Sequence, residues 1–472
     1  MALATPVMAQ DADVQTKQYD DGGIYEGTFR NGLQHGTGTY TLPNGYEYSG
    51  EWQDGEIRGR GVARFPNGSV YEGEFIKGKP EGAGKIVFSD GGTYEGMWQD
   101  GKINGTGLAV YANGVRYEGG FRNAMHHGQG RMESPGGYVY DGDWVNGVKE
   151  GTATINYPDG ATYEGDVLRG AREGQGKLVM ADGLIYEGSW LAGQIEGTGT
   201  LTQPNGDIYE GRLEAGKRSG KGRVTYSNGD IYEGDFAEDQ RHGEGTFTGA
   251  DGYRYEGGWQ AGKISGEGRV VYPDGSIYVG AFRDDLANGL GKVTYPDGAT
   301  YEGEWVGGVI EGTGRATYPN GLIYEGEFQN ARNHGQGVMT YPDGYRYEGA
   351  WRDGQRDGMG VATYADGTVY DGAFRRGLRH GTGKITMTDG FSYEGNWLDG
   401  EITGRGVARY ANGDVYDGMF ANGKRQGEGT MRYASGEEET GTWSDGTFAA
   451  QGAADGARAS PEPETDAAVQ TE

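Results

Sequence analysis

A tyrosine recurs every 23 residues through most of this chain, and this period constrains the fold more than any other feature. The series runs from Tyr25 to Tyr416 as 18 tyrosines, without an insertion or a deletion. A further, altered copy carries Glu439 at the tyrosine position, followed by Gly441 and Trp443. Self-similarity at a fixed period indicates a repeat architecture in which each unit is stabilised by its neighbours.

Alternation of residue types within each unit predicts β-strands. In most units an acidic residue, a glycine, a variable residue and an aromatic residue follow the tyrosine, as in Tyr301 to Trp305; Ser49 and Val279 replace the acid, and Val167 and Leu213 the aromatic residue. Period two places the tyrosine, glycine and aromatic residue on one face of a strand and the acidic residue on the other. Tyr-Pro-Asp-Gly, as at 341–344, predicts a turn in which Pro fixes φ, Asp caps the backbone and Gly takes a positive φ. Each unit is therefore expected to be one hairpin and one connecting turn.

The periodic glycines predict a packing role, because glycine otherwise weakens a strand. Without side chains they leave room for neighbouring rings, and each aromatic pair contributes about 0.5–1.5 kcal/mol beyond area burial. We expect Trp305 to lie over the backbone at Gly314 on the facing strand, with Tyr301 beside it. The residues assigned to this role are Tyr71, Tyr94, Trp98, Tyr301, Trp305, Tyr347 and Trp351 for an aromatic ladder, and Gly303, Gly312 and Gly314 for a glycine framework.

The unit resembles the MORN (membrane occupation and recognition nexus) repeat, a 23-residue YEGxΦxxGxxxGxG pattern in which Φ is aromatic. Residues 301–305, with Gly308, Gly312 and Gly314, form a near-consensus copy, and the resemblance covers about nine tenths of the chain. It implies an all-β fold, an elongated single-layer array of 18–19 stacked β-hairpins that twists or curves as a solenoid-like sheet. The family name raises the hypothesis of membrane binding.

Three regions follow from these boundaries. Residues 1–20 form an N-terminal segment, 21–446 the repeat array and 447–472 an acidic tail. Ser460-Pro461-Glu462-Pro463-Glu464 has low hydrophobicity and cannot bury a core, so we expect the tail to be disordered.

The first residues resemble the end of a secretory signal. Val7 and Ala9 occupy the small-residue positions before a cut ahead of Gln10, which predicts a periplasmic or secreted protein. A disordered N-terminus is the alternative, and the protein is cytoplasmic if Met1 is the true start.

Charge and cysteine content narrow the functional classes. With 42 Lys and Arg against 70 Asp and Glu, the formal net charge is −28, which argues against nucleic acid as a partner and weakens the case for anionic lipid. Cysteine is absent, so there are no disulfides, thiolate metal sites or cysteine nucleophiles. No Walker loop, nucleophile elbow or His-Glu-x-x-His motif occurs.

Two periodic features bear on binding. Histidines recur ten residues after the tyrosine, and we interpret them as loop residues, since single histidines spaced 46 or more residues apart cannot converge on one ion. We likewise interpret the acidic stripe as a solvated face. Basic residues gather in the segment 5–10 residues after each tyrosine, which we expect to be a loop, and could contact headgroups or a protein: Arg122, Arg169, Arg172, Lys217, Arg218, Arg241, Arg375, Arg376, Arg379, Lys424 and Arg425.

The sequence therefore predicts a non-enzymatic scaffold without a catalytic residue, metal or cofactor. We expect a protein partner or self-association as a homodimer through the array. A peripheral, phospholipid-binding membrane module is the alternative, and neither nucleic acid nor a small-molecule substrate is expected.

Overall fold

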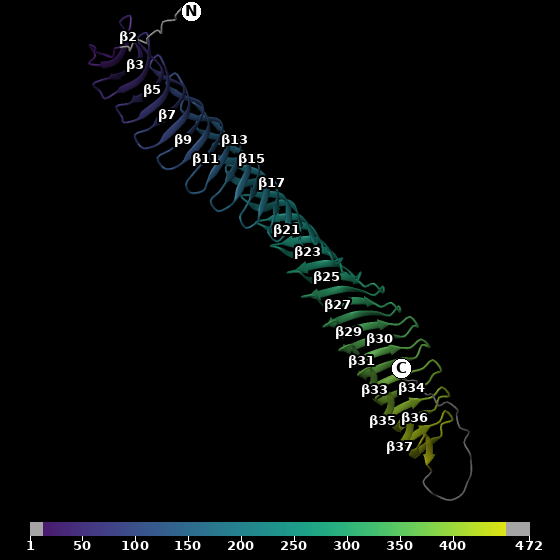
Figure 1. Cartoon of the computed structure of the whole chain (residues 1–472). Coiled ribbons are helices and arrows are strands. Elements are labelled where there is room, and N and C mark those ends of the chain that lie inside the picture. Colours follow the sequence, from purple (N-terminus) through teal and green to yellow (C-terminus); the bar gives the residue numbers. More distant parts are fainter. Residues whose placement is uncertain (1–12, 450–472) are drawn as a thin grey trace, which may run out of the picture. The chain divides into compact units, whose positions relative to one another are not determined.

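The computed structural model describes residues 13–449, and every regular element within them is a β-strand. Hydrogen bonds join 39 strands into one single-layer antiparallel sheet in which strands pair with their neighbours in the chain. Each repeat supplies a seven-residue and a nine-residue strand, such as β26 (Thr300–Val306) and β27 (Val309–Thr317). The predicted all-β array of stacked 23-residue hairpins is confirmed (Figure 1).

The chain divides into two compact units. The first holds β1 (Gln15–Gln18), β2 (Ile24–Arg30), β3 (Leu33–Thr41), β4 (Glu47–Gln53), β5 (Glu56–Arg64), β6 (Val70–Ile76), β7 (Lys79–Val87), β8 (Thr93–Gln99), β9 (Lys102–Val110), β10 (Arg116–Arg122), β11 (Met125–Glu133), β12 (Val139–Val145), β13 (Val148–Asn156), β14 (Thr162–Leu168), β15 (Ala171–Val179), β16 (Ile185–Leu191), β17 (Gln194–Thr202), β18 (Ile208–Glu214) and β19 (Lys217–Thr225). The division falls within β20 (Ile231–Ala237).

The second unit continues the same repeat. It holds β21 (Gln240–Thr248), β22 (Arg254–Gln260), β23 (Lys263–Val271), β24 (Ile277–Arg283), β25 (Leu286–Thr294), β26, β27, β28 (Ile323–Gln329), β29 (Arg332–Thr340), β30 (Arg346–Arg352), β31 (Gln355–Thr363), β32 (Val369–Arg375), β33 (Leu378–Thr386), β34 (Ser392–Leu398), β35 (Glu401–Arg409), β36 (Val415–Ala421), β37 (Lys424–Arg432), β38 (Glu438–Ser444) and β39 (Thr447–Ala449).

Two kinds of turn join the strands. The two-residue turn inside each hairpin has positive φ at both positions, as at Asn31 (53°) and Gly32 (79°), which is the type I′ geometry that matches strand twist. The turn between hairpins at 341–344 behaves as predicted. The N–H of Gly344, whose φ is 95°, donates to the carbonyl of Tyr341 (3.1 Å), and Asp343 accepts from the N–H of Tyr345 (2.9 Å).

Tyrosine rings fill the space that the paired glycines leave. Gly303 and Gly314 face each other across β26 and β27. A Cβ on Gly314 would come within 2.5 Å of the Tyr301 ring, and a Cβ on Gly303 within 2.5 Å of the Gly314 backbone. Tyr301 is 2% exposed, and its hydroxyl donates to the carbonyl of Glu304 (3.0 Å). The ring is therefore held flat on its own hairpin.

The structure corrects the expected place of Trp305. Its ring does not lie over Gly314, because Tyr301 of the same repeat already covers that glycine. Trp305 instead reaches back to the preceding hairpin, where its Nε1 donates to the carbonyl of Gly291 at 3.3 Å. It contacts Tyr301 (5.5 Å between centroids) and Tyr278 (5.2 Å) in edge-to-face geometry. Trp305 therefore joins two repeats rather than closing one.

Gly312 serves the backbone rather than ring packing. Its φ is +69°, in the left-handed region, and a Cβ there would come within 2.5 Å of the Glu304 carboxylate on the face away from the rings. It lies at the irregularity in strand register between Gly303 and Trp305. Such a bulge bends the strand and increases its local twist.

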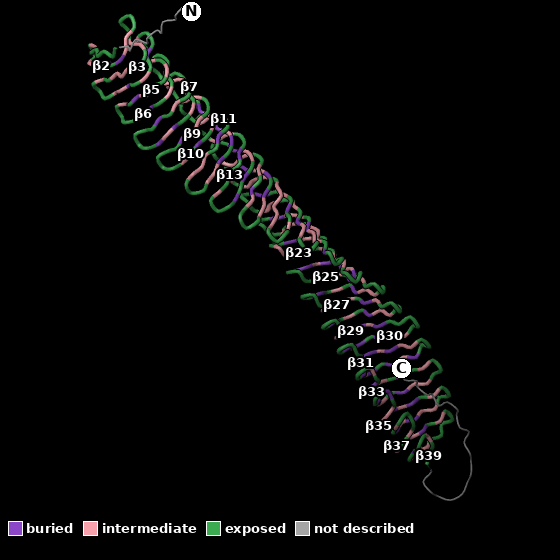
Figure 2. Tube along the Cα trace, in the orientation of Figure 1, coloured by how far each residue is buried: buried purple, intermediate pink, exposed green. Residues whose placement is uncertain are grey.

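The remaining assigned residues lie in equivalent places. Their side chains are 0–8% exposed and form the same edge-to-face pairs at 4.9–5.7 Å: Tyr71 with Trp98, Tyr94 with Trp98, and Tyr347 with Trp351. Buried positions follow the strands and exposed positions the turns (Figure 2).

The described sheet extends beyond the array boundaries at both ends. β1 lies within the N-terminal segment 1–20 and pairs with β2, and β39 lies within the segment 447–472 and pairs with β38. The signal-like residues Val7 to Gln10 and the tail from 450 lie outside the described residues, so their predictions stay predictions.

Candidate binding surface on the aromatic face

The two faces of the sheet differ in chemistry. One carries the acidic residue that follows the tyrosine in 16 of the 18 repeats and the basic residues opposite it, in exposed pairs such as Lys292–Glu302 (3.2 Å) and Arg315–Glu325 (2.8 Å). Exposed pairs of this kind contribute about 0–1 kcal/mol each. The other face, which we call the aromatic face, carries the tyrosines, tryptophans and phenylalanines of the ladder.

A groove of about 790 Å³ opens on the aromatic face of the second unit, over β24 to β26. Its floor includes Tyr278, Phe282 and Trp305, all 9% exposed or less. Tyr272 (37% exposed) and Tyr295 (40% exposed) line its rim. Concave sites lined by aromatic side chains with a few polar groups are typical of ligand binding.

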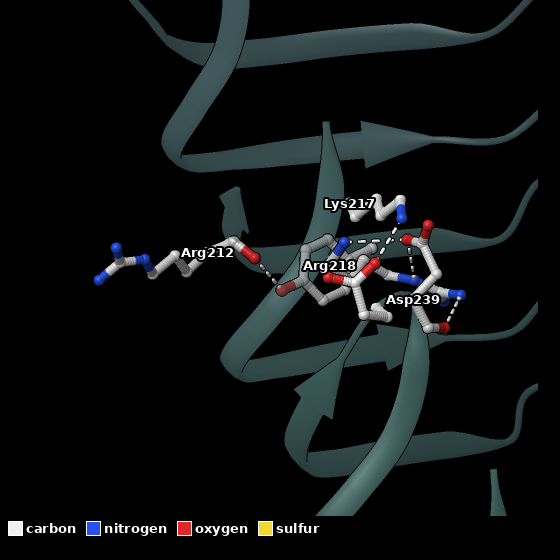
Figure 3. Close-up of polar contacts among 6 residues, drawn as sticks. Arg212, Lys217, Arg218 and Asp239 are labelled. Atoms are coloured by element: carbon white, nitrogen blue, oxygen red, sulfur yellow. Dashed lines mark hydrogen bonds and ion pairs between the residues drawn. The ribbon is translucent and has the colours of Figure 1, made fainter. Parts of the chain in front are cut away.

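Basic side chains also belong to the aromatic face, nine residues after the tyrosine of their repeat. The sequence predicted a loop there, but the second strand of each hairpin begins one residue earlier, so these positions lie inside strands. In the first unit, Arg218 donates from Nη2 to the carbonyl of Asp239 (2.6 Å), while its backbone N–H donates to the Asp239 carboxylate (2.9 Å; Figure 3). The contact ties one hairpin to the turn of the next.

The same position covers tryptophans in four repeats. The guanidinium carbon lies 4.1–4.5 Å from the ring centroid in these pairs: Arg172 over Trp190, Arg241 over Trp259, Arg379 over Trp397 and Arg425 over Trp443. In each case Nη2 donates to the carbonyl of a turn glycine at 2.6–3.2 Å, namely Gly193, Gly262, Gly400 and Gly446. A cation over an indole ring contributes about 0.5–2 kcal/mol, more when desolvated.

At the next position, His35 and His127 connect adjacent turns, whereas the Nδ1 atoms of His334 and His380 are buried without a hydrogen-bond partner among the described residues. The Nδ1 of His35 accepts from the backbone N–H of Asp54 at 3.4 Å, and Glu311 accepts from Asn330 at 3.0 Å in the same way. Asn104, Asp357 and Gln426 accept from a turn N–H at the same position, so several side-chain acceptors make this contact. Among residues 13–449, no three His, Asp or Glu side chains are placed to hold a metal ion.

Burial shifts the pKa values of several tyrosines and one histidine on the aromatic face so that their neutral forms are favoured near pH 7. Burial raises the pKa of Tyr278 and Tyr301 to about 12. It lowers the pKa of His126, whose ring stacks on Tyr117 at 3.6 Å, to about 4. Tyr278, Tyr301 and His126 are therefore uncharged near pH 7.

The chain belongs to the MORN repeat family. Eighteen consecutive segments match this repeat: 25–45, 48–70, 71–93, 94–116, 117–137, 140–162, 163–185, 186–208, 209–231, 232–252, 255–277, 278–300, 301–323, 324–344, 347–369, 370–391, 393–415 and 416–438. The family is a structural repeat, and no catalytic family is indicated. No helix within the described range is long and apolar enough to cross a membrane.

Similarity to individual proteins is local or weak. Alsin of Rattus norvegicus is 44% identical over 50 residues, which cover 10% of this chain and 3% of that protein. Two solved structures also match the chain. The SAS-4 (dCPAP) TCP domain in complex with a proline-rich motif of Ana2, from Drosophila melanogaster, is 14% identical, with 45% of this chain and 99% of that chain covered and a TM-score of 0.21. The TCP10 domain of Danio rerio CPAP in complex with a STIL peptide is 13% identical, with 71% of this chain and 97% of that chain covered and a TM-score of 0.13. Likeness at these TM-scores carries no conclusion about function.

Proposed function

We propose that this chain is a non-enzymatic scaffold that binds an extended segment of a partner protein on its aromatic face. The groove over β24 to β26 is the observation that carries this proposal. Aromatic side chains dominate protein-binding hot spots, and Tyr272 and Tyr295 expose part of their rings at its rim. On the opposite face the charged side chains form exposed ion pairs, which add little affinity.

The repeat spacing suits an extended ligand that crosses the strands. Two strands advance the array by about 9.6 Å per repeat. A polyproline II segment advances about 9.3 Å per turn of three residues. Every third residue of such a ligand therefore meets an equivalent position in the next repeat.

A display selection on the immobilised full chain tests this function. Peptides that bind should lose at least about tenfold in affinity on Tyr295→Ser, which removes a rim ring. The matched control is Leu290→Ser in the same repeat, since Leu290 is 70% exposed on the opposite face. A selection without binders, or binders sensitive only to Leu290→Ser, contradicts the proposal.

Two further measurements test whether the aromatic face binds a second copy of the chain or a lipid surface instead. Sedimentation at several protein concentrations measures self-association, and co-sedimentation with phosphatidylglycerol–phosphatidylcholine vesicles measures lipid binding. Vesicle binding that is lost on Tyr295→Ser assigns the aromatic face to lipid and overturns the proposal.

A further inference from the structure

The groove over β24 to β26 occupies the place that an arginine fills in four other repeats. In those repeats an arginine nine residues after the tyrosine covers the tryptophan of the next repeat and donates to a turn glycine. Here that position is Ala287, while the equivalent ring and carbonyl, Trp305 and Gly308, are both present. The alanine side chain is too short to reach either group. This repeat therefore has the ring and the carbonyl that would receive a guanidinium, but no guanidinium of its own.

The exposure of the ring agrees with this comparison. Trp305 is 9% exposed, whereas the four tryptophans covered by arginine are 3–5% exposed. Trp190, Trp259, Trp397 and Trp443 make up that covered group.

The second ring of the site is also in place. Each covering arginine lies 5.7–5.8 Å from the tyrosine of its own repeat, as Arg241 does from Tyr232 and Arg379 from Tyr370. Tyr278 is the equivalent ring and lines the groove. A cation placed there would meet two aromatic faces.

Charge at the rim favours a cation. Asp274 and Asp285 line the groove, and both are exposed. Asp274 accepts from the N–H and hydroxyl of Ser276 (2.8 and 2.9 Å), and Asp285 from the N–H of Ile264 (2.8 Å). Neither lies within ion-pair distance of a basic side chain in the described range; Lys263 pairs with the adjacent Asp284 (3.0 Å) and interacts electrostatically with Asp285. The formal net charge of −28 attracts basic partners over a longer range.

We propose that this groove binds an arginine side chain of the partner protein, with the guanidinium over Trp305 and donating to the carbonyl of Gly308. The inference rests on the proposed function and specifies the chemistry of the partner at one point of the aromatic face. Arginine fits better than lysine, because its planar group stacks on the indole while its N–H groups point along the ring plane.

A site-resolved measurement tests the proposal. The full chain is labelled with 5-fluorotryptophan, and Trp305→Phe assigns the ¹⁹F resonance of that ring. N-acetyl-arginine methylamide is the probe, and the citrulline analogue of the same shape but without charge is its control. The Trp305 resonance should shift with an affinity about tenfold higher for the arginine probe, since both the cation–π contact and the charged hydrogen bond are lost in citrulline.

The variant Ala287→Arg places an arginine of the chain itself where the partner's arginine is proposed to bind. We expect the Trp305 resonance to move on this substitution alone and to stop responding to the probe, while the other eight resonances keep their positions. Ile402→Arg is the matched control, since it adds the same charge at the equivalent position five repeats away. This control should retain the response to within about twofold, because screening limits the effect of a distant charge.

Several results would overturn the inference. These are a Trp305 resonance that ignores the arginine probe, responds equally to citrulline, or still responds in Ala287→Arg. A resonance that moves instead with protein concentration or with anionic vesicles assigns the groove to a second copy or to lipid. Failure here leaves partner binding elsewhere on the aromatic face untouched, whereas a display selection without binders rejects the proposed function itself.

Discussion

Replacing Trp305 with alanine should open the sheet locally, because this ring connects two repeats. The side chain is 9% exposed, contacts Tyr278 and Tyr301 edge-to-face, and donates to the carbonyl of Gly291. Truncation of a buried Trp costs about 3–5 kcal/mol. We expect the lower end of this range, about 3 kcal/mol, because the groove already leaves one edge of the ring uncovered.

Hydrogen exchange is the appropriate assay, since long repeat arrays do not unfold in one step and a single melting temperature is poorly defined. A local loss of about 3 kcal/mol raises exchange through local opening by roughly 150-fold. Because each repeat contacts only its neighbours, the increase should be confined to β24 to β28. Strands β34 to β37 should exchange as in the unaltered chain.

Two controls bracket the result. Trp305→Phe should cost only about 1 kcal/mol, because phenylalanine holds this position in adjacent repeats at Phe282 and Phe328. Glu302→Gln removes an exposed ion pair with Lys292 and should cost less than about 1 kcal/mol. If Glu302→Gln opens β24 to β28 while Trp305→Ala does not, the assignment of the two faces is reversed.

Three further predictions concern packing and pH. Gly314→Ala places a Cβ against the Tyr301 ring, so hydrogen exchange should show that the hairpin of β26 and β27 is destabilised by about 1–3 kcal/mol. The control is Gly136→Ala, whose Cβ would have no atom within 4 Å; it should change the stability of its own hairpin by less than about 0.5 kcal/mol. Burial raises the pKa of Tyr301 to about 12, from about 10 in the unfolded chain. The stability that the neutral phenol contributes is therefore complete below pH 10 and is lost as the pH rises toward 12. The circular dichroism signal of the β-sheet should accordingly stay constant up to about pH 10. Burial lowers the pKa of His126 to about 4, from about 6.5 in the unfolded chain. Its contribution to the free energy of unfolding is therefore complete above pH 6.5 and falls as the pH drops toward 4. In urea titrations, the free energy of unfolding of His126→Phe should decrease less between pH 6.5 and pH 4 than that of the unaltered chain.

The period of the sequence was enough to predict the hairpin array, the two faces and the Tyr-Pro-Asp-Gly turn. Each of these depends on residues close together in the chain, so alternation and turn chemistry determine them. The partner of each ring was harder to predict. Trp305 donates to the carbonyl of Gly291 on the preceding hairpin and does not lie over Gly314, because the Tyr301 ring already fills the space over Gly314. Alternation within one repeat does not reveal this contact between repeats.

The arginine contacts were visible in the sequence only as a relation between two repeats. An arginine nine residues after one tyrosine is followed 18 residues later by the tryptophan that it covers, as in Arg241 and Trp259. Reading each repeat separately places that arginine in a loop. Ala287 draws attention only when the arginine–tryptophan contact of the other repeats is known, because alanine at this position leaves the Trp305 ring uncovered.

Photo-cross-linking in the cells that make the protein tests the central claim most directly. A benzophenone amino acid is placed at Tyr295 on the rim of the aromatic face or at Leu290 on the opposite face of the same repeat. The account predicts that a discrete partner protein is captured from position 295 and not from position 290, and that Ala287→Arg lowers its yield. Capture of that partner from position 290 alone would contradict the assignment of binding to the aromatic face.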